Sequence, residues 1–215
     1  MELVGPVREP RDYRPASGAV MEAVQLRAPW APDLLGMRPG EHDGRVRSAA
    51  EVGIDPDGRL FAEAWARVRS GRPALPVLLA WVGARAEVSD PGPGEWLADQ
   101  ALRRLAAGAA RGVRVSEVAD EVGVSPRHLR RAVRALTGRS PKYHQRVFRL
   151  AALLRATDGQ ADPSWSRVAA ALGYSDQSHL ISEVRSLAGR TPVELHRERY
   201  REHVRFLQAV RAASD

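Results

Sequence analysis

The chain has 215 residues, 44% of them hydrophobic, which suits one large or two small globular domains and excludes a disordered chain. It contains no cysteine, which excludes disulfides, thiolate zinc sites and cysteine nucleophiles. No apolar run approaches the roughly 18 residues that a membrane helix needs, and no apolar signal-peptide core follows the first residues. We therefore expect a cytoplasmic protein that does not enter a membrane.

The net charge of +7 is concentrated in the second half of the chain. Residues 1–94 hold 12 arginines against 13 acidic residues, a net charge of −1. Residues 95–215 hold 21 basic against 13 acidic residues, a net charge of +8. A basic domain beside a neutral one indicates a polyanionic partner. The alternative is a generally arginine-rich composition, which does not explain why the first half stays neutral.

The first residues show little regular pattern. Residues 1–18 are rich in proline and charge and predict a loose arm. Residues 19–28 predict a strand, and a short helix is expected around 33–37. Residues 38–58 are rich in Gly, Asp and Arg and show little periodicity.

Two apolar segments precede a linker. Residues 59–69 predict an amphipathic helix, because five apolar residues share one face: Leu60, Phe61, Ala64, Trp65 and Val68. Residues 73–88 predict a second helix after Pro76. The tryptophans lie on apolar faces and are expected in the core. The Pro- and Gly-rich stretch 89–94 has the composition of a linker, so we divide the chain into residues 1–94 and 95–215.

Everything after the linker predicts helix. Gly, Pro, Ser or Thr marks each junction between helical segments. The expected segments are about 95–109, 115–122, 126–137, 141–156, 164–172, 177–187 and 192–209. The predicted fold is therefore mainly α, a C-terminal seven-helix bundle preceded by a small N-terminal region of helix with some strand.

The second half contains an internal repeat, from Val115 to Pro141 and from Trp165 to Pro192. Four positions agree at an offset of 50, the turn then gains one residue, and seven more agree at an offset of 51. The first set pairs Val118, Ala119, Gly123 and Ser125 with Val168, Ala169, Gly173 and Ser175. The second set pairs His128, Leu129, Val133, Leu136, Gly138, Arg139 and Pro141 with His179, Leu180, Val184, Leu187, Gly189, Arg190 and Pro192.

Each copy has the pattern of a helix-turn-helix. The first helix is expected to bury a small residue, Ala119 or Ala169, so that the second helix can cross it closely. Gly123 or Gly173 ends the first helix, since glycine tolerates a positive φ. The second helix buries three apolar residues and exposes its opposite face, as recognition helices do.

The two exposed faces differ in charge. The second helix of the first copy carries four arginines, a residue type suited to guanine edges and phosphates: Arg127, Arg130, Arg131 and Arg134. Without the repeat, such a face predicts only a solvated helix surface. The matching face of the second copy is nearly neutral, and Gln, Ser or an apolar contact with a thymine methyl can still read bases there: Gln177, Ser178, Ile181, Ser182 and Arg185.

The sequence VAAALGYSDQSHL at 168–180, followed by GRTP at 189–192, resembles the signature of the AraC/XylS-type bacterial transcription regulators. The resemblance covers about residues 95–205. It implies that two recognition helices, joined by the helix at 141–156, enter successive major grooves on one face of DNA. The implied base contacts are Arg127, Arg130 and Arg131 in the first copy, and Gln177, Ser178, Ile181 and Ser182 in the second.

The resemblance has two departures and a weaker extension. In this family an arginine is usual where Ser182 stands, and a phenylalanine is usual where Val184 stands. Residues 24–36 resemble the last strand and following helix of a sensor domain in some such regulators. A complete sensor barrel is longer than the first half of this chain, so the resemblance implies a shortened sensor, an interaction platform or a fragment of a longer product.

The leading functional hypothesis is a sequence-specific DNA-binding transcription regulator, with double-stranded DNA as its partner. The alternatives are a nonspecific or architectural DNA-binding protein, and a protein-interaction adaptor whose DNA contact is weakened at Ser182. RNA polymerase is a further candidate partner, as are a small-molecule effector or a second copy of the chain for residues 1–94. We expect no enzyme, cofactor or metal, because the six histidines form no zinc-enzyme arrangement and no catalytic motif is present.

Overall fold

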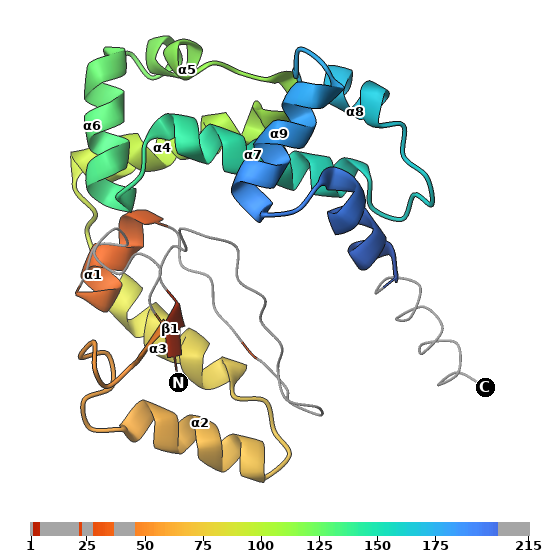
Figure 1. The fold of residues 1–215 in the computed structure, drawn as a ribbon. Coiled ribbons are helices and arrows are strands. Elements are labelled where there is room, and N and C mark those ends of the chain that lie inside the picture. Colours follow the sequence, from red (N-terminus) through yellow and green to blue (C-terminus); the bar gives the residue numbers. More distant parts are fainter. Residues whose placement is uncertain (1, 5–21, 23–27, 37–45, 202–215) are drawn as a thin grey trace. The chain divides into compact units, whose positions relative to one another are not determined.

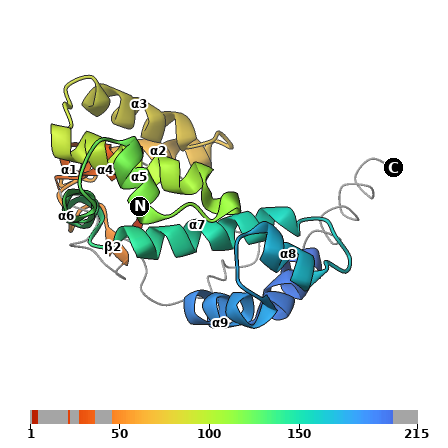
Figure 2. The ribbon, with the colours of Figure 1, turned by 90° about the horizontal axis from the view of Figure 1, so that it is seen from above.

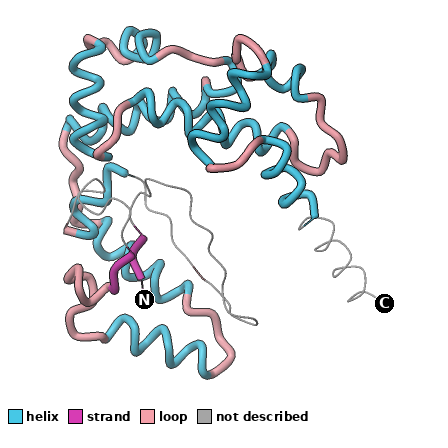
Figure 3. The backbone as a smooth tube through the Cα atoms, in the orientation of Figure 1, coloured by secondary structure: helices cyan, strands magenta, loops and turns pink. Residues whose placement is uncertain are grey.

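The computed structural model describes residues 2–4, 22, 28–36 and 46–201, and these are mainly helical (Figure 3). The chain groups into two compact units, residues 1–101 with 127–140 and residues 102–126 with 141–215. Most of the strand expected at 19–28 lies outside the described residues.

The first unit contains a short antiparallel pair of strands. Strand β1 (Glu2–Val4) lies opposite β2 (Val46–Ser48), with Glu2 facing Ser48. The loose arm expected at residues 1–18 is therefore wrong at residues 2–4, because a backbone ladder with a distant segment orders them. The short 3-10 helix η1 (Ala28–Trp30) leads into α1 (Ala31–Leu35), close to the helix expected at 33–37.

Helix α2 (Arg59–Arg69) has the predicted bounds and lies beside α3 (Leu75–Ala86). It begins where the Asp55 carboxylate accepts hydrogen bonds from the N–H groups of Leu60 and Phe61, both at 2.9 Å, so two of its free donors are satisfied. Its apolar face, however, is largely uncovered. Trp65 is 49% exposed and stacks on the ring of Phe61, which is 48% exposed, so the expected core position of Trp65 is wrong.

Two longer helices contribute to the first unit. Helix α4 (Pro93–Ala107) starts inside the predicted linker, and its first part buries Ala98 and Ala101 completely. Trp96 of α4 meets Trp30 edge to face, with ring centroids 5.9 Å apart. Helix α6 (Pro126–Thr137) begins at a proline, whose missing N–H costs nothing in a first turn.

The second unit holds the remaining helices, most of which pack around one apolar core. They are the 3-10 helix η3 (Ala109–Arg111), α5 (Val115–Glu121), α7 (Pro141–Ala156), α8 (Trp165–Ala171), α9 (Gln177–Ala188) and a helix at 192–201. In Figures 1 and 2, α9 lies alongside α7, and the two are in contact. The core residues are Ala109, Ala152, Leu153, Ala169, Leu172, Tyr174, Leu180 and Val184.

The helices expected after residue 94 are all present among the described residues, and their described ends agree within two residues. The last of them, expected to reach residue 209, is described as far as residue 201. Gly123 and Gly173 both adopt φ of +70°, as the repeat predicts for residues that end a helix. The prediction of a mainly helical chain is therefore confirmed.

Candidate nucleic-acid interface

Helix α6 separates an apolar side from an arginine side. Leu129 and Val133 are completely buried, and Leu136 is nearly so. The four predicted arginines are all exposed, and among the described residues none of them forms an ion pair with a carboxylate: Arg127, Arg130, Arg131 and Arg134. Because this face is cationic and uncompensated, it suits a polyanion.

Helix α9 exposes a face with little charge. Four of its five predicted residues are exposed: Gln177, Ser178, Ser182 and Arg185. The fifth, Ile181, is half-buried and packs against the core, so only part of its side chain faces outward. A shallow hollow runs along this face, lined by Ser178, Ile181, Ser182, Arg185 and Ser186. The polar groups that line it are small hydroxyls and one guanidinium, which are able to donate or accept hydrogen bonds at a surface.

The start of α9 is fixed by Asp176. Its Oδ1 accepts a hydrogen bond from the backbone N–H of His179 at 2.7 Å, and its Oδ2 accepts one from the hydroxyl of Ser175 at 3.0 Å. These hydrogen bonds, the one from His179 foremost, lower the pKa of Asp176. The ring of His179 meets Tyr174 edge to face, with centroids 5.4 Å apart. Asp176 thus caps the first turn of α9.

The buried side of α9 carries a polar cluster that the sequence analysis missed. A guanidinium nitrogen of Arg149, on α7, lies 2.6 and 2.7 Å from the two carboxylate oxygens of Glu183. The hydroxyl of Tyr174 donates to Glu183 at 3.1 Å, and the Arg149 guanidinium lies 4.5 Å from the centre of the Tyr174 ring. Burial, and then the Glu183 charge, raises the pKa of Tyr174, so it stays a hydrogen-bond donor. We call Arg149, Tyr174 and Glu183 the Glu183 cluster.

Arg146 extends this cluster to the surface. It is partly exposed, and its Nε lies 3.4 Å from Glu183. Its terminal nitrogen donates to the hydroxyl of Ser186 at 3.0 Å. The one sequence signal for the cluster was the position of Glu183, a charged residue on the helix face that also carries Leu180 and Val184.

The turn before α9 packs against the segment that follows α4. A Cβ added to Gly173 would lie 3.2 Å from the Cα of Gly112, so the two backbones approach with no room for side chains. Nearby, the amide of Gln145, on α7, donates to the carbonyl of Val113. The second helix-turn-helix is therefore held both by its core and by backbone contact with Gly112.

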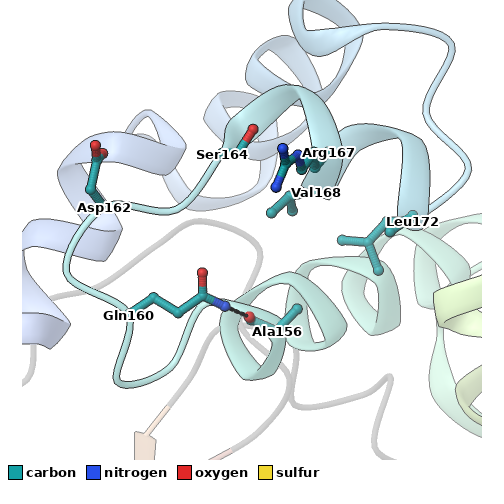
Figure 4. A pocket seen from close by; sticks show the side chains of 8 residues that line it. Ala156, Gln160, Asp162, Ser164, Arg167, Val168 and Leu172 are labelled. Carbon is teal, nitrogen blue, oxygen red and sulfur yellow. Dashed lines mark hydrogen bonds between the residues drawn. The ribbon is translucent and has the colours of Figure 1, made fainter.

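A second shallow hollow lies where the end of α7 faces α8 (Figure 4). Gln160 and Asp162 reach it from the connecting loop, while Arg167 and Leu172 come from α8 and its end. The amide of Gln160 donates to the carbonyl of Ala156. Most lining residues are exposed, which differs from the enclosed apolar sites typical of small molecules.

No group of three or more His, Asp or Glu side chains among the described residues is placed to hold a metal ion. No helix in the described part of the chain has the length and apolar character that crossing a membrane requires.

One comparison with known proteins found a match. Residues 118–198 match a family model described as a helix-turn-helix domain. The match starts within α5 and ends in the helix at 192–201, so it contains α6, α7, α8 and α9. The comparisons with curated proteins and with solved structures found no match.

Proposed function

We propose that this protein regulates transcription by binding a specific DNA sequence, because residues 118–198 match a helix-turn-helix family model and the sequence resembles the AraC/XylS-type regulators. In this proposal α6 and α9 are recognition helices that enter successive major grooves. The four exposed arginines of α6 carry the proposal, because arginine pairs with guanine edges in the major groove and with phosphates.

The length of α7 is consistent with a bipartite site. Its 16 residues span about 24 Å at 1.5 Å per residue. A connection of that size suits two recognition helices about one DNA turn, roughly 34 Å, apart. One protomer is then expected to protect an asymmetric site of two adjacent major grooves.

Residues 1–94 are proposed to serve regulation or self-association rather than DNA contact. Their net charge of −1 gives no electrostatic attraction to phosphates. The exposed aromatic pair Phe61 and Trp65 is the kind of surface that protein contacts cover. RNA polymerase, a small-molecule effector and a second copy of the chain are the partners we propose for testing.

Selection of bound sequences from a random DNA pool, followed by footprinting on the selected site, tests the proposal. A regulator gives one preferred site, at least about 10³ times tighter than competitor DNA, and protection of two adjacent major grooves. Equal affinity for all sequences would instead indicate an architectural protein. Absence of binding at low salt would indicate an adaptor that contacts proteins.

A further inference from the structure

The Glu183 cluster is almost completely withdrawn from solvent. Glu183 is 8% exposed and Arg149 is 6% exposed, while each belongs to a different helix of the second unit. The ion pair joins α7 to α9 over 34 residues of sequence. Tyr174, in the turn before α9, adds a second anchor on the same carboxylate.

Stability alone does not explain such a cluster. Desolvating two charges offsets most of their attraction, and apolar replacements of similar volume are often as stable or more so. Here the Nε of Arg149 is also buried without a hydrogen-bond partner among the described residues, which adds a further desolvation cost. The cluster therefore needs another physical role.

Directionality supplies that role. The apolar contacts of Leu180 and Val184 hold α9 in place but are non-directional, so they tolerate small rotations of the helix. Hydrogen bonds, including the charge-assisted ones between Arg149 and Glu183, lose strength steeply when their angles change. The Arg149 guanidinium and the Tyr174 hydroxyl converge on one carboxylate and thus fix the rotation of α9 about its own axis.

The first copy of the repeat has no counterpart of the cluster. Ala132 stands at the position equivalent to Glu183, and Val124 at that equivalent to Tyr174. The α6 face carries four long arginines, which reach DNA from a range of orientations, whereas the α9 face offers mainly short neutral groups. Short side chains form base contacts only when their helix is accurately aimed.

We propose that Arg149, Tyr174 and Glu183 are positioning residues that set the base selectivity of α9 by fixing the direction in which Gln177, Ser178 and Ser182 point. This inference rests on the proposed DNA-binding function. It assigns selectivity in one half of the bound site to residues that do not touch DNA.

The test replaces the whole cluster in the full chain by Arg149→Met, Tyr174→Phe and Glu183→Leu, which leaves no cluster member with an unmatched polar group. The matched control removes the exposed ion pair Arg104–Glu121, at 3.1 Å, by Arg104→Met and Glu121→Leu. Both proteins are taken through DNA selection and thermal unfolding. We expect the cluster variant to unfold at no lower temperature, yet to lose at least tenfold in selectivity at the half of the site assigned to α9.

In the control, selectivity at both halves stays as in the parent protein. A folded cluster variant with the parent's selectivity at both halves overturns the proposal. Should the triple variant not fold, the single variant Tyr174→Phe is tested in its place by the same DNA selection. It removes the hydrogen bond of the Tyr174 hydroxyl to Glu183 and keeps the ion pair between Arg149 and Glu183. A smaller loss confined to the same half supports the proposal, and unchanged selectivity overturns it.

A DNA-free measurement separates this inference from the proposed function. Failure of the parent protein to select any DNA removes the proposed function. How firmly the cluster holds α9 is then measured by amide hydrogen exchange over residues 177–188, because a helix that is held less firmly opens locally more often. Faster exchange there in the cluster variant, at equal global stability, supports the positioning role, and equal rates overturn it.

Discussion

Gly112 and Gly173 meet backbone to backbone: a Cβ on Gly173 would lie 3.2 Å from the Cα of Gly112. Gly123, the equivalent glycine of the first copy, has the same φ of +70° but open space around it. The two glycines therefore differ in crowding alone, and they make a matched pair for mutation.

We expect Gly123→Ala to lower the free energy of unfolding by about 1–2 kcal/mol, from left-handed backbone strain. Gly173→Ala should lower it by about 2–4 kcal/mol, because displacement of the Gly112 backbone adds to the same strain. Urea unfolding of both variants measures the difference. Equal decreases in the free energy of unfolding would show that the Gly112 backbone moves aside with little loss of stability.

Asp176 makes α9 sensitive to acid. Its folded-state pKa is lowered, so its stabilising effect is present above the ordinary carboxyl value of about 3.9 and is lost as pH falls through the lower folded value. We expect Asp176→Ala to lower the Tm at pH 7, and this deficit to shrink as the pH falls below about 4. Asp176→Ser, which keeps a capping oxygen, should restore part of the Tm. A pH-independent deficit would rule out the carboxylate charge as its source.

The arginine face of α6 should dominate DNA affinity. Arg130→Ala or Arg131→Ala is expected to weaken specific binding at least about tenfold, roughly 1.4 kcal/mol, while Gln177→Ala should cost less. Arg69→Ala, on α2, removes the same charge outside the interface and serves as the control. Titration against the selected site at fixed salt gives the ranking. If Gln177→Ala weakens binding while the Arg130 and Arg131 variants bind as tightly as the parent protein, then α9 contributes most of the specific DNA affinity.

Ser182 marks a place where DNA contact can be gained. It is exposed, and its neighbour Arg185 is the one arginine among the residues of that face. Ser182→Arg should tighten specific binding, because it adds a guanidinium able to pair with a guanine or a phosphate. The same titration, repeated at two salt concentrations, checks it. Unchanged affinity at both would place this face of α9 away from DNA.

The aromatic pair on α2 should be independent of DNA contact. Phe61→Ser with Trp65→Ser removes two half-exposed rings from the first half of the chain. We expect affinity for the selected site to change less than about twofold per protomer, which is within about 0.4 kcal/mol. Sedimentation of both proteins shows whether the pair mediates self-association. A tenfold loss of DNA affinity in a protein that stays monomeric would contradict the division of labour.

The helices that the sequence predicted correctly are those determined by interactions between residues close together in the chain. Helix α2 and the helices of the repeat follow apolar periodicity and capping residues, which act within a few positions of the chain. The repeat likewise placed the exposed arginines of α6. These features depend on neighbours in sequence, so they can be predicted without a structure.

Pairings between distant residues were not predictable in this way. Arg149 and Glu183 meet through the packing of two helices, and β1 meets β2 across more than forty residues. The periodicity of α2 likewise identifies an apolar face without indicating that Trp65 stays half exposed. Ile181 was assigned to the surface because its spacing matches that of Ser178 and Ser182, although it also borders the core.

The Glu183 cluster also limits how the protein can be re-engineered. Exchanging α9 for α6 aligns the apolar positions but puts Ala132 where Glu183 stands, so no acid reaches Arg149. An alanine from α6 would leave that guanidinium buried and uncompensated, at a cost of about 3–5 kcal/mol. Retargeting should therefore substitute the outward residues of α9 individually and leave Glu183 in place, so that a new binding preference is carried by the existing scaffold.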